Sequence, residues 1–280
     1  MTISTVPLSP TLGVEVRGLN TKNPSELEKT QLRDLFLKHR VILIREANVS
    51  EDEHLRLAEC IGPISSADAN MKDGRKFTHI SNVHEGGRLP EGELLFHSDH
   101  MFLDEALRGI SLFALEVPSK GGETCFLDAG RAHRSLPEDV RKSIAGLSAL
   151  HVYDYSANRG DRRPSVEELQ ALQKKGTVDM AIHPIVSPHP ETGEPILYVS
   201  RLFTVQIMGW PRNESDALLE TLFNHLESHG ADYVHPWRVG DLIIWDNCAL
   251  QHSRNDFDPK EKRALRRVPI GDGSRTAKAA

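Results

Sequence analysis

The order of apolar and polar positions along the chain divides it into a few helices and many short strands. Apolar residues recur at helical spacing after residues 23–26, which are typical of a helix start, and after Ser50 and Ser165, each of which is placed to cap the first turn of a helix. Helical spacing also extends over residues 214–229, and Pro137 suits the first position of a further short helix. We expect ordinary core packing to be the role of the first two helices.

Strands are predicted where short apolar runs are bounded by turn residues. Residues 41–44 and 242–245 are continuous apolar runs, which indicate strands buried on both faces. Further strands are expected at 12–16, 110–117, 123–127, 150–155, 182–187, 195–199 and 263–270. Because no βαβ repeat appears, and the helices lie at the start and between blocks of strands, the pattern predicts a mainly β fold, a sandwich or barrel with flanking helices.

Two polar stretches interrupt this pattern. Residues 64–93 are polar and rich in glycine, which predicts a long loop that rims any site formed just after it. Residues 156–179 contain several charges followed by a capped helix, and this insertion between strands is a candidate lid, although an ordinary solvated insertion explains it equally well. We expect residues 1–280 to form a single domain that carries this insertion.

Composition narrows the classes of function. The chain of 280 residues is 39% hydrophobic and 26% charged, as soluble globular proteins are. A net charge of −6 and a pI near 6.2 argue against a nucleic acid or an anionic membrane as partner, and no apolar run is long enough to span a bilayer. The three cysteines are scattered and no secretion signal is visible. We therefore expect a cytoplasmic protein that binds a small molecule, with a homo-oligomer left open.

The segment 96–100, with the sequence FHSDH, carries the first candidate chemistry. His97 and Asp99 are two residues apart on an extended segment, so they point to the same side. With a distant histidine, for which His252 is the best candidate, they would complete the 2-His-1-carboxylate set that holds non-haem Fe(II). Because the chain has 14 histidines, about one His-x-Asp is expected by chance, and the tripeptide gains weight only from its surroundings.

Two arginines follow His252 on a predicted strand. Arg263 and Arg267 are four residues apart, so their side chains face the same way. A guanidinium is a rigid fork that matches the two oxygens of a carboxylate, and two inward arginines would be costly without an anionic partner. Thr124 offers a hydroxyl that could complete such a carboxylate site. Taken alone, the two arginines could also be surface charges.

Several motifs occur in one order along most of the chain. They are FHSD at 96–99, GGET at 121–124, HP at 183–184, the segments 193–198 and 240–247, His252, and the two arginines after it. With these motifs the chain resembles the taurine/aryloxyalkanoate dioxygenase family. The resemblance implies a double-stranded β-helix (jelly-roll) fold and dependence on Fe(II), 2-oxoglutarate and O2. It also implies oxidation, most simply hydroxylation, of a small organic substrate with release of succinate and CO2.

The resemblance further implies a role for each candidate residue. The three candidate ligands would hold the iron. Arg267 would pair with the distal (C5) carboxylate of 2-oxoglutarate, and Thr124 would hydrogen-bond to the same group. Arg263 would lie near the C1 carboxylate or the substrate.

Two positions depart from the taurine enzymes of this family, which use a histidine in the loop before the first motif and an asparagine four residues before the first ligand. Residues 65–70 contain no histidine, and Glu93 stands four residues before His97. Since a carboxylate would repel a sulfonate, we do not expect taurine to be the substrate. Glu93 and His100 are the candidate substrate contacts, although His100 could equally be a packed or solvent-exposed histidine. Aryloxyalkanoates, alkyl sulfates, other sulfonates and amino-acid derivatives stay open, as does desaturation.

Two other interpretations of the same residues remain. Residues 97–100 echo the clusters of zinc or dinuclear metallohydrolases, but those sites need a further histidine where this chain has Leu95, and they do not need paired arginines. A non-catalytic β-sandwich that binds a small ligand would leave the candidate metal ligands and the arginines unexplained. Metal analysis and 2-oxoglutarate-dependent O2 uptake separate the three hypotheses.

Overall fold

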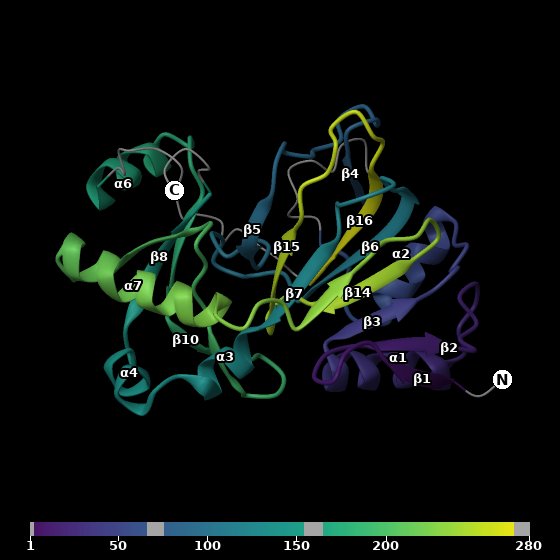
Figure 1. The fold of residues 1–280 in the computed structure, drawn as a ribbon, viewed down its shortest axis with the longest axis horizontal. Helices are drawn as coiled ribbons and strands as arrows, with labels where there is room; N and C mark the ends of the chain where they lie inside the picture. Colours follow the sequence, from purple (N-terminus) through teal and green to yellow (C-terminus); the bar gives the residue numbers. More distant parts are fainter. Residues whose placement is uncertain (1–2, 66–75, 154–164, 272–280) are drawn as a thin grey trace.

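In the computed structural model, which describes residues 3–65, 76–153 and 165–271, two main β-sheets face each other and helices lie outside them (Figure 1). The larger sheet has seven strands in the order β1 (Ser4–Pro7), β2 (Val14–Arg17), β3 (Val41–Ile44), β14 (Leu242–Asp246), β6 (Gly109–Glu116), β16 (Ala264–Ile270) and β4 (Thr78–Ser81). The smaller main sheet has the order β13 (Tyr233–His235), β7 (Thr124–Asp128), β15 (Leu250–Arg254) and β5 (Leu94–His97). All neighbouring strands in both sheets are antiparallel except β2 and β3.

The apolar runs in the larger sheet are buried on both faces, because side chains alternate between two cores. In β3 and β14, Ile42 and Ile244 pack on one face against the helices α1 (Glu26–His39) and α2 (Glu51–Glu59). Their neighbours on the other face, among them Trp245, pack against the smaller main sheet. The ring of Trp245 meets that of Phe126 from β7 edge-on, with centroids 5.4 Å apart. The prediction of a mainly β fold with flanking helices is confirmed.

The predicted helix starts at residues 23–26, at Ser50 and at Ser165 are confirmed. Ser25 and Ser50 begin α1 and α2 with a complete capping box, in which the serine side chain accepts from the third helical residue and the Glu there accepts from the serine. Ser165 begins α6 (Val166–Lys174) in the same way. Among the described ranges, no helix has the length and apolar character that crossing a bilayer would need.

A second layer packs beside the smaller main sheet. It contains a three-stranded sheet of β12 (Thr204–Ile207), β8 (Ser148–Val152) and β9 (Met180–Pro184), the hairpin of β10 (Val186–Pro188) and β11 (Pro195–Leu197), and the helices α3 (Ala129–Ser135), α4 (Glu138–Ser143) and α7 (Arg212–Glu227). The helix α6 packs through Leu169 against this three-stranded sheet. Residues 156–164 of the candidate lid lie outside the described residues, so closure over a site stays a prediction.

Several elements differ from the sequence pattern, among them these four. The stretch 64–93 contains β4, a short strand with polar side chains whose extended form comes from pairing with β16. The strand β1 was not expected, because its exposed residues show no apolar face. Pro137 is the N-cap of α4 and not its first helical residue. His252 lies within β15, a strand that was not among those expected from the sequence.

Candidate metal centre and active site

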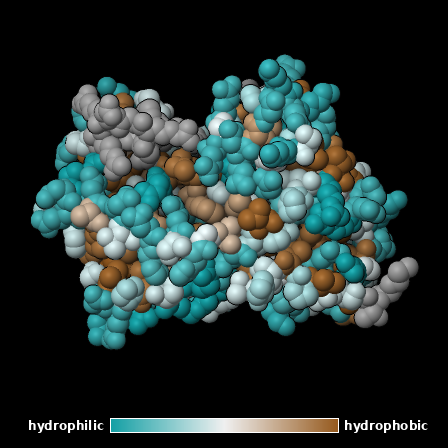
Figure 2. Space-filling view, viewed as in Figure 1, coloured by the Kyte–Doolittle hydropathy of each residue, from teal (hydrophilic) through white to brown (hydrophobic). Residues whose placement is uncertain are grey.

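A cavity of about 260 Å³ lies between the two main sheets. One side of it, the strand wall, consists of residues from the strands of the two main sheets or just beyond their ends: Thr78, His79, Ile80, Leu94, His97, Asp99, Leu112, Thr124, Trp245, His252, Ser253, Arg254, Arg263, Leu265 and Arg267. The other side, the loop wall, consists of residues from connecting segments: Gly86, Arg88, Pro90, His100, Phe102, Leu103, Tyr153, Asp179 and Phe203. The molecular surface is hollowed between the part that carries α6 and the part that carries β4, with apolar side chains in the hollow (Figure 2).

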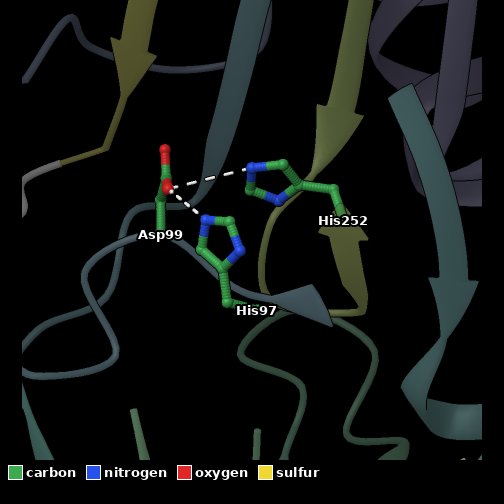
Figure 3. A group of neighbouring side chains, drawn as sticks. All are labelled: His97, Asp99 and His252. Carbon is green, nitrogen blue, oxygen red and sulfur yellow. Dashed lines mark ion pairs between the residues drawn. The ribbon is translucent and has the colours of Figure 1, made fainter. Parts of the chain in front are cut away.

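The structure brings together the three residues that the sequence proposed as metal ligands. His97 is the last residue of β5 and stands directly opposite His252 in the register of β5 with β15. Asp99 follows two residues later, and one ligand atom of each residue lies within 4.8 Å of the other two. Asp99 Oδ1 lies 3.3 Å from Nε2 of His97 and 3.8 Å from Nε2 of His252 (Figure 3). Backbone pairing of two strands therefore places residues that are far apart in sequence.

The Nε2 atoms of both imidazoles face the carboxylate of Asp99. Nδ1 of His97 lies 2.8 Å from the carbonyl oxygen of Leu95, and because a carbonyl only accepts, Nδ1 carries the proton. Burial, together with the nearby His97, lowers the pKa of His252 to about 3, so His252 is neutral near pH 7. Neutral imidazoles are the form that binds a metal ion.

Asp99 is the anionic member of the group. Burial alone would raise its pKa, but the charge of the nearby Arg267 outweighs burial and, with the neighbouring imidazoles, holds the pKa of Asp99 well below its usual value. Arg267 donates to Oδ2 of Asp99 from Nη2 at 2.7 Å and from Nε at 3.2 Å. This leaves Oδ1 facing the two histidines.

Asn247 fixes the backbone at Asp99. Its Oδ1 accepts from the backbone N–H of Asp99 at 2.8 Å, and its Nδ2 donates to the carbonyls of Asp99 (2.9 Å) and Leu107 (3.0 Å). Asn247 is fully buried, in the turn between β14 and β15. The next residue after Asp99, His100, has a φ of 63°, a conformation rare outside glycine. The chain thus turns sharply just after the candidate ligand.

The other end of the strand wall is basic. Arg263 is buried and donates to the carbonyl of Gly122 at 3.1 Å, and burial, with the charge of Arg254, lowers its pKa to about 9. Thr124 accepts at Oγ1 from the indole N–H of Trp237 at 2.9 Å. Sequence analysis missed Arg254, although its position two residues after His252 places it on the same side of the strand. We call Thr124, Arg254 and Arg263 the basic corner.

The candidate substrate residues fall in different places. His100 lines the cavity as part of the loop wall. Glu93 is exposed and is not among the described residues that line the cavity. The loop wall also contains an aromatic group that sequence analysis missed, in which Phe102 contacts Phe203 and Tyr153, with ring centroids 5.1 and 4.5 Å apart. No periodic pattern marks these rings, because they come from three segments that are far apart in the sequence.

The donor set fits a divalent transition metal. Two imidazole nitrogens and one carboxylate oxygen on one side of an ion are the facial triad of non-haem iron sites. The three side chains approach from one side only, from β5 and β15 (Figure 3), which leaves the cavity side open for other ligands. The fully buried asparagine behind Asp99 is the kind of outer partner that orients a metal ligand.

Comparisons with known proteins agree with this geometry. The family model of the taurine catabolism dioxygenase TauD, TfdA family matches residues 4–268. The (S)-phenoxypropionate/alpha-ketoglutarate-dioxygenase of Delftia acidovorans is 26% identical, with 94% of this chain and 93% of that protein covered. The alpha-ketoglutarate-dependent 2,4-dichlorophenoxyacetate dioxygenase of Cupriavidus pinatubonensis is 27% identical over 97% and 99% of the two chains.

The fold is also similar to that of solved structures. A taurine dioxygenase from Burkholderia xenovorans superposes with a TM-score of 0.77 at 26% identity, and the match covers 96% of this chain and 91% of that one. The family match extends over nearly the whole chain, and the strands it includes are those that carry the candidate ligands. The chain therefore belongs to the TauD/TfdA family, and it is a 2-oxoglutarate-dependent dioxygenase.

Proposed function

We propose that this protein is an Fe(II)-dependent member of the family that hydroxylates a small organic acid, on a single domain with a jelly-roll fold. The observation that carries the proposal is the convergence of His97, Asp99 and His252 in the same cavity as the basic corner. A metal triad at one end and buried arginines at the other suit a dicarboxylic 2-oxo acid that must reach both.

We call the part of the cavity that holds His97, Asp99, His252 and Arg267 the metal end. Three features of the structure would support the reaction there. The neutral imidazoles of His97 and His252 and the carboxylate of Asp99 would hold Fe(II), which when bound supplies the chemistry that activates O2. Arg267 would keep Oδ2 of Asp99 turned away from the metal, which leaves Oδ1 as the ligand atom. The two packed sheets would exclude bulk water from the reacting groups.

The geometry favours an exchange of the roles that the family resemblance implied for the two arginines. Arg267 already pairs with Asp99, so it lies at the metal end, where the C1 carboxylate would sit. Arg263 lies four residues away on the chain and beside Gly122, near Thr124. We therefore assign Arg263, with Thr124, to the distal carboxylate of 2-oxoglutarate and Arg267 to the metal end. Release of succinate and CO2 would follow from decarboxylation of this cosubstrate.

The loop wall would select the primary substrate. Its rings, Phe102, Tyr153 and Phe203, offer apolar area for a flat or hydrophobic body. Arg88 lines the same wall, with Nη1 3.5 Å from the hydroxyl of Tyr153, and could receive an acidic group. His100 would contact the same substrate. This arrangement, together with relatives that act on phenoxypropionate and 2,4-dichlorophenoxyacetate, supports an aryloxyalkanoate as the first substrate to test.

A screen for succinate formation tests the proposal. Purified protein would be loaded with Fe(II) without oxygen and then given O2, 2-oxoglutarate and one candidate substrate at a time, with aryloxyalkanoates, alkyl sulfates, sulfonates and amino-acid derivatives as separate arms. We expect succinate formation that requires all components, together with a hydroxylated product. Activity with Zn(II) and without 2-oxoglutarate would contradict the proposal and favour a metallohydrolase.

A further inference from the structure

The cavity contains an arginine to which the family resemblance assigned no role. Arg254 follows His252 by two residues on β15, so both side chains leave the strand on the same side. Arg254 is only 4% exposed and lines the same cavity. Its Nη2 donates to the backbone carbonyls of Pro90, at 2.6 Å, and Gly92, both of which are uncharged acceptors.

Arg254 shares one corner with two residues that the proposed function already uses. In the register of β15 with β7 it stands directly opposite Thr124, a position from which side chains of neighbouring strands touch. The guanidinium of Arg263 reaches the same corner, because it donates to Gly122, two residues before Thr124 on the chain. The basic corner therefore holds two buried guanidinium groups beside one hydroxyl.

Two like charges buried at one corner repel each other and favour a bound anion. Among the described residues, Arg263 forms hydrogen bonds to a backbone carbonyl and no ion pair with a carboxylate. The acids among the residues described as lining the cavity are Asp99 and Asp179. Asp99 is engaged at the opposite end by Arg267. A ligand with a carboxylate at the basic corner would relieve the repulsion.

We propose that Arg254 is a second binding residue for the distal carboxylate of 2-oxoglutarate, together with Arg263 and Thr124. This inference rests on the proposed function, and it adds the source of selectivity for the cosubstrate. Two arginines around one carboxylate favour a dicarboxylic 2-oxo acid over a 2-oxo acid whose chain ends in a methyl group. The alternative is that Arg254 only ties the segment 90–92 to the sheet.

The affinities for two ligands distinguish a contact of Arg254 with the distal carboxylate from a purely structural role. The dissociation constants of 2-oxoglutarate and 2-oxopentanoate, which has a methyl group in place of the distal carboxylate, are measured by calorimetry on the full chain loaded with Mn(II). The variants are Arg254→Gln, the charge-preserving Arg254→Lys, and Arg238→Gln, which removes an exposed positive charge outside the cavity. Circular dichroism checks that each variant is folded.

In Arg254→Gln we expect binding of 2-oxoglutarate to weaken roughly 10- to 100-fold, with little change for 2-oxopentanoate, so that the preference for the dicarboxylic acid falls. Arg254→Lys should lie between this variant and the native chain, and Arg238→Gln should match the native chain. If the preference stays at its native value, whether both ligands weaken together or neither does, Arg254 does not contact the distal carboxylate. If the native chain fails to bind 2-oxoglutarate, the proposed function itself is wrong.

Discussion

The strand wall and the loop wall of the cavity are built on different principles. The strand wall takes its residues from strands of the two main sheets, and the pairing of β5 with β15 holds His97 and His252 opposite each other. The loop wall takes Phe102 from a connection, and it takes Tyr153 and Phe203 from just beyond the strand ends of the three-stranded sheet, where backbone hydrogen bonds of Tyr153 with Asp179 and of Phe203 with Val152 continue that sheet. Any sequence that keeps the two main sheets places the first wall, whereas the second also depends on a separate sheet and on the connecting segments.

This difference explains how one chemistry can accompany different substrates. Side chains on paired strands stay in place when loops change length or composition, so the metal end and the basic corner do not depend on the segments that form the loop wall. Asp99 is the exception, because it lies beyond the end of β5. Asn247 compensates by binding both the N–H and the carbonyl of Asp99, which makes the loop residue as well fixed as the strand residues.

The largest effect is expected when the strand wall loses a ligand. His97→Ala should abolish turnover that depends on iron, because two protein ligands hold the ion more weakly and leave it with the wrong open positions. The exposed His229→Ala serves as the matched control and should keep native activity. Full activity in the His97 variant would show that the ligands have been misassigned.

The next largest effect is expected at Asn247. Asn247→Ala should weaken binding of Co(II) or Mn(II) about 10- to 100-fold, because Asp99 loses the partners that orient its backbone. Equilibrium dialysis measures the affinity, and the absorption spectrum of bound Co(II) reports any change in ligand geometry. The control Asn224→Ala lies on the exposed side of α7. Native metal affinity in a folded Asn247 variant would mean that the strands alone place Asp99.

A smaller and more selective effect is expected from the loop wall. His100→Gly should change kcat/KM for the substrate found in the screen by about tenfold, since one pocket contact of this kind is worth roughly 1–3 kcal/mol. The affinities for the metal and for 2-oxoglutarate should stay within about twofold of native, because glycine accepts the φ of 63° at this position. A fall in metal affinity as large as that of Asn247→Ala would mean that the two walls are not independent.

The smallest effect is expected at His54, a buried histidine of α2 that contacts β6 and β16 of the larger sheet. His54 donates to Ser111 and accepts from Arg266 on β16, and burial lowers its pKa to about 3. The unfolded chain therefore binds more protons than the folded chain between about pH 6.5 and pH 3. The contribution of neutral His54 to the free energy of unfolding is fully present above this window and is lost as pH falls through it.

Urea unfolding measures this loss. Between pH 7 and pH 5 we expect the free energy of unfolding to fall by about 1–2 kcal/mol for each such buried histidine. His54→Gln should reduce the slope, because glutamine does not titrate, even if the variant is less stable at pH 7. An equal slope in the two proteins would show that His54 is not kept neutral by the fold.

The sequence predicted best where the physics is local. Ser50 and Ser165 cap helices as predicted, and Ser25 caps the helix that was predicted to start within residues 23–26, because a capping box needs only residues three positions apart. The runs 41–44 and 242–245 form buried strands because every side chain in them is apolar. The strand β4 was missed since its polar residues become extended only by pairing with β16, almost two hundred positions later in the chain.

The sequence by itself determined the kinds of side chain available, the motif order that marks the family, and the pairing of His97 with Asp99 through their spacing of two residues on an extended segment. The tertiary structure decided which distant partners join them. Only the register of β15 against β5 and β7 shows that His252 faces His97 and that Arg254 faces Thr124. Only folding brings Arg267 to Asp99. Contacts between residues far apart in a chain depend on how sheets pair and pack, and the local spacing of residues carries no record of that pairing.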